Sequence, residues 1–193
     1  MSKKNQTTRT DYLTSDQYAK LVGCLSADKN VLGETYARVA KATALRIADV
    51  LALTWGKLLS KQFTVTEKKT GKKRTITVSQ KTHEAFVELY RKNGEPGDTA
   101  VFMNRRTEKP YTTQYINREM KEWKRKYGIA VGNFSSHSFR KSFGREYWDK
   151  QGRTDEALLK LSIIFNHSSI AVTRIYLGIR DEEIADAYEM IDA

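Results

Sequence analysis

The chain has 193 residues, enough for one domain with a sizeable core, and its 39% hydrophobic and 10% aromatic content excludes an intrinsically disordered protein. Its 34 lysine and arginine residues outnumber 23 acidic residues, giving a formal net charge of +11, so a polyanionic partner is favoured, nucleic acid first and an anionic membrane surface second. The charge alone is equally compatible with a basic soluble domain that has no such partner.

Helical periodicity follows a polar, basic N-terminal segment, residues 1–11, which we expect to be a flexible tail or linker. Apolar side chains then recur at helical spacing over the first third of the chain. Three helices are predicted there. The first starts after Thr14, with Ser15 or Asp16 near its cap, and the second runs from about Gly33 to Lys41. The third follows Arg46 and closes at Trp55-Gly56.

The period then changes from helical to alternating. Phe63 and Val65 alternate with threonines, as do Ile76 and Val78, and the basic stretch 68–73 with its one glycine lies between the two runs. This pattern predicts an antiparallel β-hairpin with a basic tip.

Helical spacing dominates the rest of the chain. A helix that carries Phe86 and Tyr90 is expected to stop near Asn93-Gly94, and a short strand is expected at Val101-Phe102. The remaining apolar stripes predict helices around 116–127, 139–147 and 158–165, a helix capped by Ser168 or Ser169 that carries Tyr176, and a last helix from near Asp181. The predicted fold is mainly α with a small antiparallel sheet (α+β), made of one domain over 12–180 and a C-terminal helix over 181–193.

Several classes of protein lack support in the sequence. A single cysteine, Cys24, cannot form an internal disulfide and fits a reducing compartment. The N-terminal residues do not resemble a signal peptide and no apolar run reaches the length of a membrane span, so we expect a cytoplasmic, nucleoid-associated protein with no membrane partner. No zinc-ligand spacing or Walker-type phosphate loop occurs, and we expect neither a metal nor another cofactor.

Four segments carry basic and hydroxyl-bearing residues that suit phosphate chemistry. Taken singly, each has an ordinary explanation: a surface arginine, a solvated charged turn, a helix-surface pair and a half-buried core tyrosine. The segments are Arg46 at the start of an amphipathic helix, the lysines of the hairpin tip, His137 with Arg140 on one helical face, and the run from His167 to Tyr176.

In chain order, these segments resemble the signature of the tyrosine recombinases, the phage integrase family. That signature contains an Arg in a T-G-L-R-x-x-E/D stretch, a hairpin Lys, H-x-x-R, a second His or Trp in an L-G-H turn, and a Tyr about one helix later. The match covers residues 43–176. The resemblance implies the catalytic-domain fold of that family and the catalytic residues Arg46, Lys69, His137, Arg140, His167 and Tyr176.

The implied activity is site-specific cleavage and rejoining of double-stranded DNA through a 3′-phosphotyrosyl intermediate, without metal or ATP. Guanidinium groups stay protonated and bond phosphate oxygens in a fork, which suits Arg46 and Arg140 to the non-bridging oxygens, with His167 as a further donor. Tyr176 is the expected nucleophile, because a phenol attacks and leaves more readily than an alcohol.

The remaining roles complete the proton transfers and the DNA contacts that the resemblance implies. Lys69 is the expected general acid for the leaving 5′-oxygen, with Lys68 and Lys72 as alternatives, and His137 accepts the tyrosyl proton or orients the phosphate. Asp49 is expected to be structural, near the site. The residues expected to bind DNA are Lys68, Lys72, Lys73, Arg74 and Lys141.

The sequence departs from the family pattern at several positions. Ala44 replaces a usual Gly, so we expect the turn before Arg46 to avoid a positive φ, whereas Asn166, which replaces another Gly, tolerates the left-handed region. Lys141 stands where a His is frequent. Family members also carry an N-terminal DNA-clamping domain, and the segment before residue 12 is too short to be one, so the chain is either a fragment or a minimal relative.

The C-terminal helix is expected to govern assembly. Ile184, Tyr188 and Ile191 form an apolar face that packs on a neighbouring protomer or on its own domain. We expect a monomer in isolation and a homo-oligomer, a tetramer, on DNA. The alternative functions are a DNA-binding module with this fold but no independent activity, and relaxation of the type IB topoisomerase kind.

Overall fold

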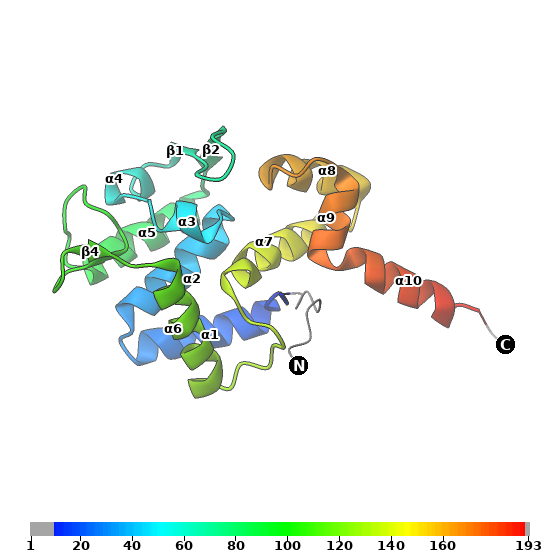
Figure 1. Ribbon diagram of the computed structural model, residues 1–193, viewed down its shortest axis with the longest axis horizontal. Coiled ribbons are helices and arrows are strands. Elements are labelled where there is room, and N and C mark those ends of the chain that lie inside the picture. Colours follow the sequence, from blue (N-terminus) through cyan, green and yellow to red (C-terminus); the bar gives the residue numbers. More distant parts are fainter. Residues whose placement is uncertain (1–9, 192–193) are drawn as a thin grey trace, which may run out of the picture.

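A computed structural model describes residues 10–191, and its chain forms a helical body with two short antiparallel sheets (Figure 1). The fold is mainly α with a small antiparallel sheet, as the sequence predicts. The helices are α1 (Ser15–Ala27), α2 (Val31–Thr43), α3 (Ile47–Val50), α4 (Trp55–Leu58), α5 (Gln80–Lys92), α6 (Thr113–Lys126), α7 (Ser136–Lys150), α8 (Asp155–Ile164), α9 (Ile170–Leu177) and α10 (Ile179–Glu189). The strands are β1 (Gln62–Thr66), β2 (Lys73–Thr77), β3 (Met103–Asn104) and β4 (Lys109–Pro110).

Two hydrophobic clusters make up the core. The larger one contains the aromatic set Tyr36, Phe102 and Phe139, whose rings meet edge to face. The smaller one joins the C-terminal part of α7 to α8 and α9 through Trp148, Leu161 and other apolar residues. The helix α7 contributes to both clusters, so it carries its functional residues at the boundary between them.

The predicted hairpin is present as β1 and β2. Its register pairs Phe63 with Ile76 and Val65 with Arg74, and the apolar members of these pairs are buried. The turn between the strands, residues 67–72, closes with backbone bonds from Glu67 N–H to the Lys72 carbonyl and from Gly71 N–H to the Glu67 carbonyl. Gly71 has a φ of +67°, which a glycine adopts without strain.

The first helices differ in their bounds from the prediction. Thr14, rather than Ser15 or Asp16, caps α1, with Gln17 completing a capping box. The helix predicted after Arg46 is interrupted, because the chain around Thr54 pairs with residues 99–101 and Trp55 starts a separate helix instead of closing one. Local periodicity cannot reveal such a break, since the pairing partner lies more than forty residues away. The strand expected at Val101-Phe102 begins instead at Met103.

The N-terminal end of the described chain is packed against the domain. The expected tail was placed over residues 1–11, and its first nine residues lie outside the described part. Asp11, however, pairs with Asn133 through its backbone N–H and its carboxylate, and Leu13 is buried. The ordered domain therefore begins earlier than the sequence indicated.

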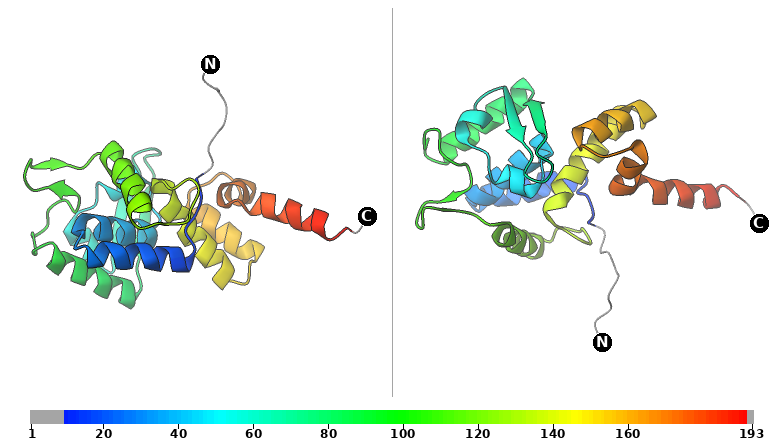
Figure 2. Two further views of the ribbon diagram at one scale, coloured as in Figure 1. Left: turned by 90° about the horizontal axis from the view of Figure 1, so that it is seen from below. Right: turned by 45° about the horizontal axis from the view of Figure 1, so that its top comes forward.

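The last helix, α10, begins at Ile179, two residues before the predicted start, directly after Gly178 with a φ of +81°. It extends away from the helical body in all three views (Figures 1 and 2). Ile179, its first residue, is buried, whereas Ile184, Tyr188 and, just beyond the helix, Ile191 are exposed. Among residues 10–191, none of the helices combines the length and apolar character that a membrane span needs.

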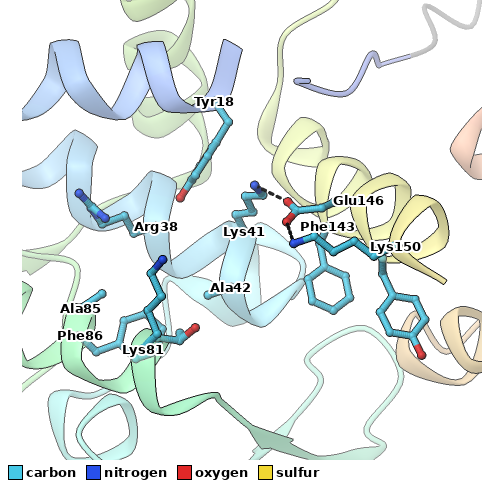
Figure 3. A pocket seen from close by; sticks show the side chains of 12 residues that line it. Tyr18, Arg38, Lys41, Ala42, Lys81, Ala85, Phe86, Phe143, Glu146 and Lys150 are labelled. Carbon is cyan, nitrogen blue, oxygen red and sulfur yellow. Dashed lines mark hydrogen bonds and ion pairs between the residues drawn. The ribbon is translucent and has the colours of Figure 1, made fainter. Parts of the chain in front are cut away.

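A pocket of about 490 Å³ lies between α1, α2, α5 and α7 (Figure 3). Apolar side chains such as Phe86 and Phe143 line it, and the basic residues Arg38, Lys41, Lys81 and Lys150 also border it. None of the residues predicted to be catalytic contributes to this pocket.

Candidate active site

The turn before Arg46 has the left-handed conformation that the sequence did not lead us to expect. Ala44 has a φ of +50° and forms the C-cap of α2, so the expectation that an alanine here avoids positive φ is wrong. This conformation costs a residue with a Cβ on the order of 1–2 kcal/mol. Tertiary contacts offset that cost: the Ala44 methyl is fully buried in the smaller cluster and its carbonyl accepts a hydrogen bond from Arg140.

Arg46 lies at the N-cap position of α3 and is held by a buried carboxylate. Its Nη1 donates to Glu67 Oε2 at 2.7 Å, and only 2% of Glu67 is exposed. Glu67 Oε2 also accepts from Thr70 Oγ1 at 2.8 Å and from Asn166 Nδ2 at 3.2 Å. Burial raises the pKa of Glu67, but these hydrogen bonds outweigh burial and hold that pKa below its usual value.

The sequence pattern did not indicate Glu67 as a site residue. Its partners Arg46 and Asn166 lie far from it in the chain, and the one local sign of a role is that it is an acid at the start of a basic turn. Asp49, expected to be structural, is buried and accepts a hydrogen bond at 2.8 Å from the backbone N–H of Lys68. Both carboxylates therefore lie at the base of the hairpin turn.

The basic residues of the hairpin fall into two groups. Lys68, Lys69, Lys72 and Lys73 are exposed, as DNA contacts and a general acid require. Arg74 faces the protein instead: its Nη2 donates to the Thr43 carbonyl at 3.0 Å, and burial lowers its pKa. The geometry of Arg74 favours support of the site over the DNA contact predicted for it.

Arg140, on α7, is buried and fixed by two backbone carbonyls. Its Nη1 donates to the Ala44 carbonyl and its Nη2 to the Phe165 carbonyl at 2.7 Å, with the guanidinium 4.5 Å from the centre of the Phe165 ring. Burial lowers the Arg140 pKa to about 10, so the group is still protonated at neutral pH. A buried cation with neutral partners is costly unless an anion completes its environment.

His167 and Tyr176 meet on one side of Arg140. Their ring centres are 5.1 Å apart, and Phe165 packs edge to face on Tyr176 at 5.5 Å. Ser169 caps α9, as predicted, and places Tyr176 two turns along that helix. His167 Nδ1 lies 3.0 Å from Thr173 Oγ1, and burial together with the charges of Arg140 and Arg46 lowers the His167 pKa to about 4.

The Tyr176 hydroxyl is buried beside the Arg140 guanidinium, which lies within reach of a weak hydrogen bond to it. Burial raises its pKa to about 12, and the positive charges of Arg140 and Arg46 partly offset that rise. A buried hydroxyl with so weak a partner is energetically unfavourable.

His137 and Lys141 complete the surroundings of the tyrosine. The His137 ring lies 6.4 Å from that of Tyr176, and Lys141 Nζ lies 5.3 Å from the Tyr176 ring centre. With Thr10 and Ile175 they line a pocket of about 320 Å³. Only 6% of Lys141 is exposed, so its ammonium faces the nucleophile more than the surface predicted to bind DNA.

The predicted site residues are thus brought together from four separate segments. Burial lowers the His137 pKa, and the charges of Arg140, Arg46, Lys141 and Lys69 lower it further, which places all of them within electrostatic reach of one histidine. In the part of the chain that the structure describes, no cluster of His, Cys, Asp and Glu side chains could hold a metal ion.

Comparisons with known proteins show which family the chain resembles. The model of the phage integrase family matches residues 11–183. The "Probable integrase/recombinase YoeC" of Bacillus subtilis (strain 168) is 31% identical over 149 residues, which are 77% of this chain and 78% of that protein. Among solved structures, XerA recombinase superposes with a TM-score of 0.70 at 19% identity, over 98% of this chain and 66% of its own.

A lambda integrase tetramer bound to a Holliday junction superposes with a TM-score of 0.68 at 18% identity, over 91% of this chain and 50% of its own. This chain therefore spans between half and two thirds of the length of these two solved structures. Their low identity supports the fold, and the family match and the Bacillus relative support the membership. The chain belongs to the phage integrase family.

Proposed function

We propose that the chain cleaves and rejoins double-stranded DNA at specific sites through a covalent bond between Tyr176 and the 3′-phosphate. The observation that carries this proposal is the buried Tyr176 hydroxyl within electrostatic reach of Arg140 and Arg46. A nucleophile beside two fixed guanidinium groups is the arrangement that phosphoryl transfer without a metal needs, because the transition state gathers negative charge on the non-bridging oxygens.

The two arginines neutralise that charge. Arg140 is held by carbonyls at both ends of its fork, and Arg46 by the Glu67 carboxylate, so neither guanidinium has to reorganise when charge develops. The phosphate supplies the anion that buried Arg140 lacks among its protein partners. His167 adds a neutral donor beside the same phosphate, since its lowered pKa keeps it uncharged at neutral pH.

In the proposed cleavage step, one bond to phosphorus forms and one breaks. The Tyr176 oxygen forms a bond to phosphorus, the bond from phosphorus to the 5′-oxygen breaks, and the phosphodiester energy is retained in the tyrosyl ester. His137, next to the nucleophile, accepts the phenolic proton. Lys69, exposed at the hairpin turn, gives a proton to the departing 5′-oxygen, and the reverse transfers accompany rejoining.

A nicked suicide substrate tests the nucleophile. The substrate loses a short fragment after cleavage, so the covalent adduct accumulates. We expect wild type to form the adduct, Tyr176→Phe to form none, and the matched variant Tyr111→Phe, at a tyrosine outside the site, to behave as wild type. An equal adduct yield from wild type and Tyr176→Phe would overturn the assignment. Relaxation of a supercoiled plasmid that carries no specific site would indicate a topoisomerase-like outcome instead.

We further propose that double-stranded DNA is the partner and that copies of the chain assemble on it through α10. The lambda integrase comparison is of a tetramer bound to a Holliday junction. The apolar residues Ile184, Tyr188, Met190 and Ile191 of α10 and its end are exposed, with 79% of Tyr188 accessible. The same segment is rich in acidic residues, and the apolar pocket of Figure 3 is bordered by the basic residue Lys81, whereas Lys41 and Lys150 there already pair with Glu146.

The assembly proposal has its own test. We expect deletion of residues 179–193 to abolish the higher-order complex on a two-site DNA, while binding of one copy to one site persists. A charge reversal at the pocket, Lys81→Glu, should weaken the same higher-order complex. Assembly that survives both changes would overturn the role of α10. Because DNA is the substrate, we also propose a cytoplasmic, nucleoid-associated location, which a fluorescent fusion would test.

A further inference from the structure

The turn of the hairpin, residues 67–72, lacks a hydrophobic anchor of its own. After buried Glu67, every residue of the turn is exposed. Hydrogen bonds from outside the hairpin must therefore fix its position, because an exposed turn on a two-stranded ribbon otherwise samples many conformations. Lys69, the proposed general acid, lies in the middle of this turn.

Asp49 supplies one such bond, to the backbone N–H of Lys68, and Asn166 supplies three more with both ends of its side-chain amide. Its Nδ2 donates to Glu67 Oε2 at 3.2 Å and to Thr70 Oγ1 at 3.4 Å, and its Oδ1 accepts from Lys72 Nζ at 3.1 Å. The three partners flank Lys69 on both sides in the sequence. A single side chain thus ties the start, middle and end of the turn to a segment almost a hundred residues away.

That segment also belongs to the active site. The carbonyl of Phe165, the preceding residue, accepts from Arg140 Nη2 at 2.7 Å, and the next residue is His167. Glu67, bonded to Asn166, in turn holds Arg46 at 2.7 Å. The amide of Asn166 therefore connects the hairpin to the same turn that orients the second arginine and the histidine.

We propose that Asn166 is a positioning residue that latches the hairpin turn onto the active site and so holds Lys69 at the leaving 5′-oxygen. This inference rests on the proposed role of Lys69. It assigns a function to a residue that stands where the resembling proteins usually have glycine, which has no side chain to form such a latch.

The backbone of Asn166 makes a clean test possible. Its φ is +50°, a conformation that glycine adopts at no steric cost. Asn166→Gly therefore deletes the amide without straining the turn, and the hydrogen bond from Arg140 to the Phe165 carbonyl does not depend on the deleted atoms. Melting temperature and affinity for DNA serve as checks that the variant is folded and binds.

The decisive readout is the dependence of cleavage on the leaving group. A 5′-bridging sulfur leaves as a thiolate and needs no proton, because a thiol is far more acidic than an alcohol. We would measure single-turnover adduct formation on nicked duplexes with a 5′-bridging oxygen or sulfur, for wild type, Asn166→Gly and Lys69→Met. We expect Asn166→Gly to slow cleavage of the oxygen substrate roughly 10- to 100-fold, the loss typical of a misplaced catalytic group, and to approach the wild-type rate on sulfur.

The possible outcomes distinguish the role of Asn166 from the role of Lys69 as general acid. A defect of Asn166→Gly that is equal on both substrates, or no defect at all, overturns the latch. Rescue of Asn166→Gly by sulfur without rescue of Lys69→Met supports the latch and overturns Lys69 as the acid, leaving another residue of the turn in that role. Rescue of both variants supports both proposals, and rescue of Lys69→Met alone overturns only the latch.

Discussion

At the scale of single residues, the free protein keeps Tyr176 protonated and favours the neutral forms of His137 and His167. Burial raises the Tyr176 pKa to about 12, and burial with neighbouring arginines lowers the pKa of His167 to about 4. The pKa of His137 is lowered for the same reasons. A bound phosphate reverses part of this electrostatic environment, because its negative charge offsets the arginines. A nearby negative charge raises the pKa of His137, which favours its proposed role as proton acceptor, and raises the pKa of Tyr176 as well.

The lowered pKa of His167 predicts a pH dependence of stability. The unfolded histidine titrates near 6.5 and the folded one near 4, so between these values the unfolded state binds more protons. Stability attributable to this group is present above about pH 6.5 and is lost as the pH falls toward 4. Urea unfolding at pH 7.5 and pH 5 should show a smaller loss for His167→Asn than for wild type. Equal losses in the two proteins would contradict the assignment.

At the scale of elements, α7 approaches its neighbours at a glycine. A Cβ on Gly144 would lie 2.7 Å from Leu177 Cδ2 and 2.8 Å from Phe165 Cζ. Leu177 follows Tyr176 in the chain, and the carbonyl of Phe165 accepts a hydrogen bond from Arg140. The close approach at Gly144 therefore sets the distance between α9 and α7, the helix that carries Arg140. The catalytic geometry depends on this packing as well as on the polar contacts.

Substitution of this glycine tests the packing. Gly144→Ala should lower the free energy of unfolding by about 1–3 kcal/mol, as overpacking does, and should also slow adduct formation by displacing Phe165 and Leu177. Gly23→Ala in α1 is the matched control, since its Cβ would meet nothing within 4 Å and alanine favours helix. The control should be neutral or stabilised by about 0.5–1 kcal/mol. Denaturant unfolding measures the free energy of unfolding of both variants. An unchanged free energy for Gly144→Ala would show that the helices can move apart without cost and would contradict the packing role.

Elements with strong local patterns could be predicted from the sequence, and features set by distant contacts could not. The hairpin followed from alternation in β1 and β2, and the cap of α9 from a serine at the right spacing. The left-handed Ala44 and the break before Trp55 depend on partners elsewhere in the chain. The six residues of the candidate site were selected by their order along the chain, whereas Glu67 was missed because three separate segments create its environment.

At the scale of the whole molecule, a net charge of +11 favours binding to the phosphate backbone irrespective of sequence. The exposed lysines of the hairpin are expected to contribute to this binding, whereas Arg74 faces the Thr43 carbonyl. The two kinds of basic residue should therefore differ in how they affect the salt dependence of DNA binding.

Binding to a fixed duplex at several salt concentrations tests this difference. Lys73→Ala should reduce the slope of log K against log salt by about 1, the value for one lost phosphate contact. Arg74→Gln should change that slope less, because its guanidinium is turned toward the protein. A larger change for Arg74→Gln than for Lys73→Ala would place Arg74 on the DNA after all.

If Tyr176 forms the covalent link to DNA, identification of the linked residue is the decisive measurement. The adduct trapped on a nicked suicide substrate would be digested with protease and nuclease, and the nucleotide-bearing peptide would be sequenced by mass spectrometry. We expect a 3′-phosphate ester on the peptide that contains Tyr176. An adduct on another residue, or one joined to the 5′ end of the DNA, would contradict it.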